Sequence, residues 1–126
     1  MGYTTTNFED LEVWQLSIEL AVEIYKVTNK FPKSELYSLT NQMRRAASSI
    51  SANIAEGYGR HNYKEKIQFY KIANGSLLEV KSFCYLAERL KYIDKDELDG
   101  LLNQFVPVQK LINALIKSIR EKNETK

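Results

Sequence analysis

The stretch NQMRRAASSISANIAEGYGR, residues 41–60, indicates the fold class and raises the main functional question. Its apolar side chains recur every three or four residues, which is the period of an amphipathic helix, at Met43, Ala46, Ile50 and Ile54. Small residues make the rest of the helix thin: Ala47, Ser48, Ser49, Ser51, Ala52 and Ala55. Arg44 and Arg45 lie beside the core line, where an unpaired charge is costly to bury. We therefore expect both arginines to contact a carboxylate, a carbonyl or a bound anion.

The same helical period continues on both sides of this stretch. It predicts helices over residues 10–28, from 35 to 55 or 56, over 62–90 and over 94–120, with no competing strand pattern. Asn62 with Glu65, and Asp94 with Glu97, have the spacing of capping residues. Short breaks between helices favour antiparallel neighbours. We predict an all-α, antiparallel up-down-up-down four-helix bundle, a single domain over residues 1–126 with an ordered core at about 8–120.

Several local features follow from this reading. We expect Ser34 to cap the second helix and Leu36 to begin its core line. The core line of the third helix is predicted to include Phe69 at its start and Leu90 at its end. Three glycines receive local roles: Gly57 and Gly59 are predicted to end the second helix in the left-handed conformation, and Gly75 to allow close approach of another backbone.

Composition limits the cellular setting and the partners. The single cysteine, Cys84, excludes an internal disulfide and suits a reducing cytoplasm. No apolar run approaches the roughly 20 residues that a membrane span requires, so no membrane partner is expected. Residues 26–71 contain nine Lys/Arg and three Asp/Glu, whereas the remainder contains nine and thirteen. The local charges of +6 and −4 point to an anionic partner.

The sequence argues against an enzyme and against a bound cofactor. His61 is the only histidine, and no second His or nearby Cys completes a metal site. A Glu-x-x-His pair, a phosphate-binding loop and a Gly-x-Ser-x-Gly turn are all missing from the sequence. Cys84 lies on an apolar helix face, which favours a buried, unreactive thiol. We predict no catalytic, metal or cofactor residues.

Three segments together resemble a known bacterial family. They are LEVWQLSIELAVEIYKVTNKFP (11–32), QMRRAASSISANIAEGYGR (42–60) and FYKIANGSLLEVKSFCYLAERLKYI (69–93). They are similar to four-helix bundle proteins encoded in 23S ribosomal RNA intervening sequences, a family that includes the accessory variability determinant of diversity-generating retroelements. The resemblance implies a ring of five subunits and work beside a reverse transcriptase and its RNA. It points to these motif residues: Arg44, Arg45, Asn53, Glu56, Gly57, Gly59, Arg60, Gly75, Ser76, Leu77 and Glu79.

Two functions remain open at this stage. In the first, a non-catalytic oligomer binds structured RNA or other nucleic acid through Lys33, Arg44, Arg45, Arg60, Lys64 and Lys66, with phosphates as the main contacts. In the second, the protein is an interaction scaffold for a reverse transcriptase or a ribosomal component, and the arginines serve its own assembly. In either case the apolar or thin surface left over on the first two helices predicts a subunit interface: Trp14, Ile18, Tyr25, Ala47, Ser48 and Ala52.

Overall fold

The computed structural model describes residues 7–124 of the chain, with side chains to residue 123. Its elements are η1 (Phe8–Asp10), α1 (Glu12–Thr28), η2 (Lys33–Glu35), α2 (Leu39–Tyr58), α3 (Tyr63–Arg89) and α4 (Lys95–Glu124). The prediction of an all-α fold with four helices is confirmed, since the described part of the chain has four α-helices and no strand.

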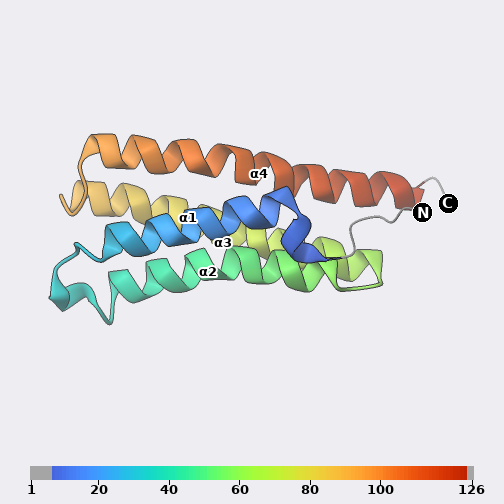
Figure 1. Ribbon diagram of the computed structural model, residues 1–126, viewed down its shortest axis with the longest axis horizontal. Helices are drawn as coiled ribbons and strands as arrows, with labels where there is room; N and C mark the ends of the chain where they lie inside the picture. Colours follow the sequence, from blue (N-terminus) through green and yellow to red (C-terminus); the bar gives the residue numbers. More distant parts are fainter. Residues whose placement is uncertain (1–6, 125–126) are drawn as a thin grey trace.

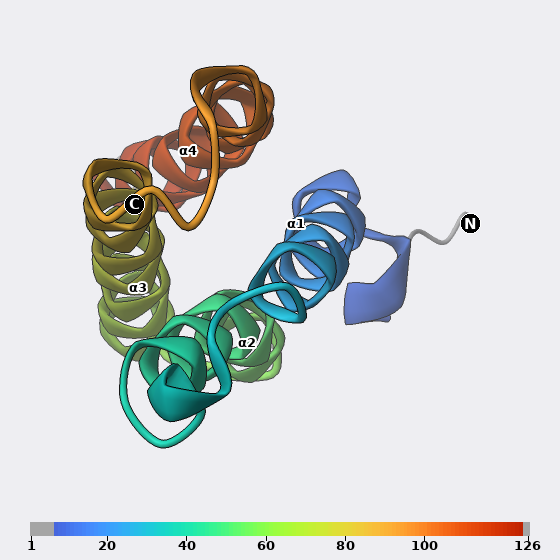
Figure 2. The same cartoon turned by 90° about the vertical axis from the view of Figure 1, so that its left-hand side faces the viewer.

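The four helices pack side by side, and each contacts two others. Neighbouring pairs are α1 with α2, α2 with α3, α3 with α4, and α4 with α1. The end-on view in Figure 2 shows this order around the bundle. In Figure 1 the α1–α2 and α3–α4 connections lie at the left end, and the α2–α3 connection lies at the right end beside the C-terminal part of α4.

Side chains from both connections hold the left end together. The Tyr92 hydroxyl donates a hydrogen bond of 2.7 Å to Glu35, and its ring packs on Phe31 with ring centroids 5.2 Å apart. Lys30 forms an ion pair with Glu97 at the start of α4. The hydrogen bond from Lys30 is the main reason that the pKa of Glu97 lies below its ordinary value. These contacts join the α1–α2 connection to the α3–α4 connection, 57 to 67 residues away in sequence.

The predicted core lines are largely confirmed. Met43, Ile50 and Ile54 of α2 are 0% exposed, and Val80 of α3 and Val108 of α4 are equally buried. Three predicted core positions are wrong. Leu36 and Leu90 are 46% and 44% exposed because both lie outside the α-helices, and Phe69 is only partly buried because its neighbour Tyr70 occupies the core.

Side-chain hydrogen bonds to backbone N–H groups mark the N-terminal ends of α2, α3 and α4. Asp94 and Glu97 form the predicted reciprocal box, each backbone N–H donating to the other side chain at 3.0 and 2.8 Å. Asn62 Oδ1 accepts from the N–H groups of Lys64 and Glu65. The start of α2 was predicted wrongly: Ser38, not Ser34, accepts from the N–H of Leu39, and η2 precedes the helix.

The glycine predictions are correct only for the position of Gly59, which is the C-cap of α2. No described glycine has a positive φ, and the left-handed position belongs to Lys91, φ 66°, after α3. There the N–H of Tyr92 donates to the carbonyl of Ala87, which closes that helix end. Gly57 lies inside α2, and Gly59 follows it with φ −78°. Gly75 is exposed, with nothing within 4 Å of a Cβ placed there, so no backbone approaches it closely.

Candidate nucleic-acid interface

Arg44 closes the end of α1 instead of reaching outward. Its Nε donates to Thr28 Oγ1 at 2.9 Å, and an Nη donates to the carbonyl of Tyr25 at 3.4 Å. Its guanidinium lies 4.8 Å from the centre of the Tyr25 ring. A cation at a helix C-terminus is stabilised by the unpaired carbonyls and the helix dipole. The contact with a carbonyl that the sequence predicted for Arg44 is therefore present within one chain.

Lys66 does the same for α2. Its Nζ donates to the carbonyls of Tyr58 at 2.8 Å and Gly57 at 3.3 Å, and it lies 5.4 Å from the centre of the Tyr58 ring. Burial lowers the pKa of Lys66 from its ordinary value. Lys66 is thus bound to its own fold, and this geometry gives it a structural role at the α2–α3 turn.

Arg60 is engaged at the same turn. It pairs with Glu56 at 3.0 Å and approaches Glu65 at 4.0 Å. Its guanidinium lies 4.8 Å from the centre of the Phe69 ring. The two carboxylates compensate the charge of Arg60, so it contributes little net positive potential to the surface.

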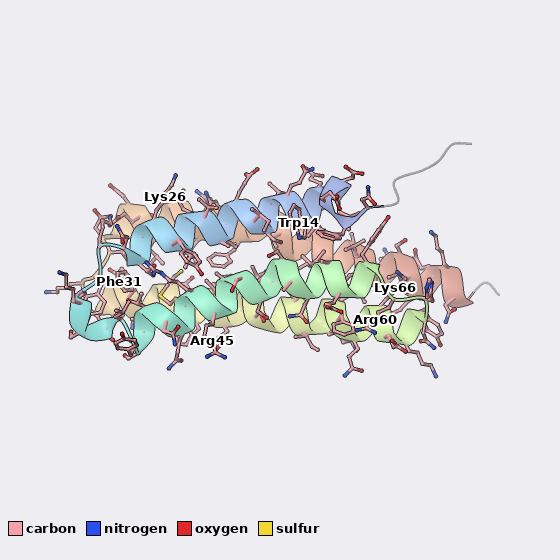
Figure 3. All side chains as sticks on the ribbon, turned by 60° about the horizontal axis from the view of Figure 1, so that its bottom comes forward. Trp14, Lys26, Phe31, Arg45, Arg60 and Lys66 are labelled. Carbon is pink, nitrogen blue, oxygen red and sulfur yellow. The ribbon has the colours of Figure 1, made fainter. Side chains whose placement is uncertain are left out.

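The nucleic-acid residues predicted from sequence do not form one surface. Arg60 and Lys66 lie near the α2–α3 turn, whereas Arg45 lies toward the other, N-terminal end of α2 (Figure 3). Lys33 lies on η2, before α2 begins. Lys26 points away from the opposite side of the bundle in the same view. The charge excess of residues 26–71 is therefore spread around the molecule.

Arg45 and several motif residues instead meet between α2 and α3. A hollow of about 330 Å³ is lined there by Asn41, Gln42, Arg45, Ala46, Ser49, Ser76 and Glu79. The hydroxyls of Ser49 and Ser76 lie 2.9 Å apart, and Asn53 Nδ2 donates to Ser49 at its carbonyl and its hydroxyl. The Ser49–Ser76 pair thus links α2 to α3, and Asn53 holds the Ser49 hydroxyl from within α2. The motif residue Leu77 is a core side chain, 1% exposed.

The predicted subunit interface is partly wrong. Ala47 is 0% exposed within the single chain, because it faces the bundle core, so it cannot form an outer surface. Trp14 is partly covered by Phe8 in an edge-on ring contact of 5.2 Å. Ile18 is half-buried, and Ser48 and Ala52 are exposed. Tyr25 is 46% exposed, with Arg44 against its ring.

The structure assembles a basic surface that the charge count of residues 26–71 identified only in part: Lys64, a predicted nucleic-acid contact, and Lys71 belong to it, but its cations on α4 lie outside that range. Lys64 and Lys71 of α3 share adjoining hollows with Lys117 and Arg120 of α4, and of the side chains described by the structure only Glu121 is an acidic one that lines them. Among described residues, Lys71, Lys117 and Arg120 have no ion pair. The sequence shows that residues 117, 120 and 122 are basic. It does not show that the basic side chains of α4 line hollows together with those of α3.

These hollows form a shallow groove between the two helices. One hollow, of about 420 Å³, is lined by Tyr63, Lys64, Ile67, Arg120 and Asn123. A second, of about 570 Å³, is lined by Lys71, Asn74, Asn113, Ile116, Lys117, Arg120 and Glu121. Arg120 belongs to both, so they adjoin. We call this surface the α3–α4 groove.

Two other observations bear on chemistry. Burial raises the pKa of Cys84 to about 12, so this thiol carries no thiolate at neutral pH. Within the described part of the chain, no group of three His, Cys, Asp or Glu residues is placed to hold a metal ion. No helix in this part of the chain combines the length and the hydropathy of a membrane span.

Together these features define a four-helix bundle protein with polar links between helices and a cationic groove on one side. The chain belongs to the family of 23S rRNA-intervening sequence proteins, whose model matches residues 9–114. This confirms the family that the sequence resembles. A comparison with curated proteins gives no match.

A solved structure is similar over most of the chain. It is the crystal structure, at 1.70 Å resolution, of a protein of unknown function from the S23 ribosomal protein family of Bacteroides thetaiotaomicron. The two proteins are 27% identical, with a TM-score of 0.74, over 83% of this chain and 98% of the other. The four-helix fold is therefore shared with a member of known structure.

Proposed function

We propose that this up-down-up-down bundle is a non-catalytic, cytoplasmic protein that assembles into a ring-shaped homo-oligomer and binds structured RNA or other nucleic acid. The observation that carries the proposal is the excess of cations around the α3–α4 groove. Among the described side chains, Lys64, Lys71, Lys117 and Arg120 share these hollows with one carboxylate, that of Glu121. Uncompensated cations clustered on one face are the electrostatic footprint of a phosphate-binding surface.

Binding to RNA should depend on these cations and on salt. For wild type, we expect affinity to fall with salt at a log–log slope of about −0.7 per phosphate contact on single strands. A Lys117→Glu, Arg120→Glu double variant should lose affinity by at least about tenfold and flatten the slope by about 1.4, which is two contacts. Fluorescence anisotropy with a labelled RNA of mixed hairpin and loop structure, over a salt series, measures both quantities.

The matched control is a Lys26→Glu, Lys33→Glu double variant. It changes the net charge by the same amount, on α1 and η2, away from the groove. We expect it to keep most of the affinity, because its charges lie outside the binding surface. Equal losses in the two double variants would assign the effect to overall charge, and no binding of RNA or DNA at low salt would refute the proposed function.

Self-assembly is the second part of the proposal. It is supported by large apolar side chains that the single chain leaves exposed, among them Leu86 and Leu90. Family resemblance suggests five subunits. Light scattering coupled to size exclusion should therefore report several times 14.6 kDa, and a monodisperse 14.6 kDa species at micromolar concentration would contradict the ring.

Arg45→Ala separates assembly from folding. Arg45 is exposed and forms no ion pair among the described residues, so its loss should leave the thermal melt of the subunit nearly unchanged. If Arg45 pairs with a neighbouring subunit, the variant should dissociate at higher protein concentration than wild type. An unchanged dissociation profile would remove Arg45 from the interface.

The exposed apolar side chains also support a second candidate function. A scaffold that docks a reverse transcriptase, as in the retroelement accessory proteins, or a ribosomal component would use such a surface without touching nucleic acid. The two functions predict opposite results for isolated RNA: the scaffold binds none at low salt, whereas the nucleic-acid binder does.

A further inference from the structure

The α3–α4 groove has an apolar floor between its charged edges. Ile116 of α4 is 8% exposed and Ile67 of α3 is partly buried, and both line the hollows. Tyr63, at the first turn of α3, is 37% exposed and lines the hollow that Arg120 and Asn123 complete. Phosphates alone would gain nothing from this floor, because they are fully charged and strongly hydrated.

We propose that the groove binds an unpaired nucleic-acid strand, with bases against the apolar floor and Tyr63, and phosphates toward the lysines and Arg120. This inference rests on the proposed function and specifies its ligand. Unpaired bases expose faces that stack on aromatic side chains, whereas a duplex presents mainly phosphates and sugars. Only the unpaired strand fills both the floor and the edges.

The charge arrangement supports a strand lying along the groove. Lys64 and Lys71 are seven residues apart on α3, which is about two helical turns, or roughly 10 Å. Lys117 and Arg120 are one turn apart on α4 and share hollows with these lysines. Positive charge therefore borders the groove on both helices, as a backbone that follows the groove would require.

Asn74 gives an independent indication of a ligand in the same groove. Its Oδ1 is screened from solvent and has no hydrogen-bond partner among described residues, although the residue lines the larger hollow. Buried polar side-chain atoms in proteins are nearly always hydrogen-bonded. An exocyclic amine or ring N–H of a base, entering with a small rotation of the amide, supplies the missing donor.

The test compares strands of one sequence in two forms. A labelled ten-nucleotide RNA and the blunt duplex that it forms with its complement are titrated with the full-length protein at about 0.1 M salt, where electrostatic screening is substantial. We expect the single strand to bind at least about tenfold more tightly than the duplex, because only it stacks on the floor. Equal or tighter duplex binding would overturn the inference and leave the proposed function intact.

Three variants test contacts inside the groove without changing its charge. Tyr63→Ala should weaken single-strand binding about 5- to 150-fold, the range for loss of one stacked base, while Tyr63→Phe keeps most of the affinity. Asn74→Leu removes the unsatisfied acceptor, so we expect an unchanged or higher melting temperature together with weaker single-strand binding. Equal effects of Tyr63→Ala on strand and duplex would contradict base stacking. If neither form binds, the proposed function fails as well.

Discussion

Replacing Gly57 with alanine should destabilise the fold, although alanine is the better helix former. A Cβ at position 57 would lie 2.7 Å from Tyr70 Cε1 and 3.0 Å from Phe69 Cβ. Tyr70 is 1% exposed and fills the core between helices, so it has little room to move. Overpacking of this kind costs about 1–3 kcal/mol, whereas alanine gains only about 0.5–1 kcal/mol in an open helix position, so the net effect over most of this range is destabilising.

The matched control is Gly75→Ala, in the neighbouring helix. Position 75 is exposed, helical and free of any atom within 4 Å of a new Cβ. We expect it to stabilise the protein by about 0.5–1 kcal/mol, because only helix propensity changes. Urea unfolding followed by circular dichroism measures both variants. If Gly57→Ala were as stable as wild type, the close packing of α2 on Tyr70 would be wrong.

The parts of the fold that sequence predicted well are those encoded locally. The spacing of Met43, Ile50 and Ile54 reports one face of one helix, and all three are buried. The box of Asp94 and Glu97 is also local, since the two residues lie within one turn. Periodicity and capping require no knowledge of the neighbouring helices.

The failures come from contacts between helices. Gly57 was interpreted as a helix end, but its small size is required by Tyr70 of α3. Leu36 follows the apolar period, yet η2 and the turn after it remove it from the helix. Lys91 takes a left-handed conformation that sequence rules reserve for glycine, because the turn into α4 demands it.

The candidate site was predicted only in part, for the same reason: of the six predicted cations, Lys64 alone lines the α3–α4 groove. Counting charge along the chain favoured residues 26–71, but two of the predicted cations serve helix ends: Arg44 at α1 and Lys66 at α2. Among the described residues, a cluster of cations without ion pairs lies where α3 and α4 meet, and two of its members, Lys64 and Lys117, are 53 residues apart in sequence. Arg44 thus stabilises the bundle itself. Lys64, Lys71 and Lys117 are the exposed lysines at the groove.

The core prediction with the largest expected effect concerns Ile50. It is 0% exposed in the middle of α2, and Ile50→Ala should reduce the free energy of unfolding by about 2–5 kcal/mol, from lost burial and the cavity left behind. A domain of this size has about 5–15 kcal/mol in total, so the variant should melt at a clearly lower temperature. Urea denaturation with an unchanged slope would assign the loss to the native state.

Phe83→Ala provides the contrast. Phe83 and Cys84 are adjacent on α3, and the structure buries Cys84 fully and Phe83 only partly. Truncating Phe83 removes more atoms than truncating Ile50. Because Phe83 is only partly buried, the space that it leaves opens toward solvent and forms no closed cavity. We therefore expect it to cost less than Ile50→Ala, below the roughly 3–5 kcal/mol that a fully buried phenylalanine loses.

The reverse order of the two losses would mean that α3 is rotated from the orientation described, or that Phe83 is buried by a neighbouring subunit. Repeating the measurement below the concentration at which the oligomer dissociates separates these two explanations, because only a contact with another subunit disappears on dilution.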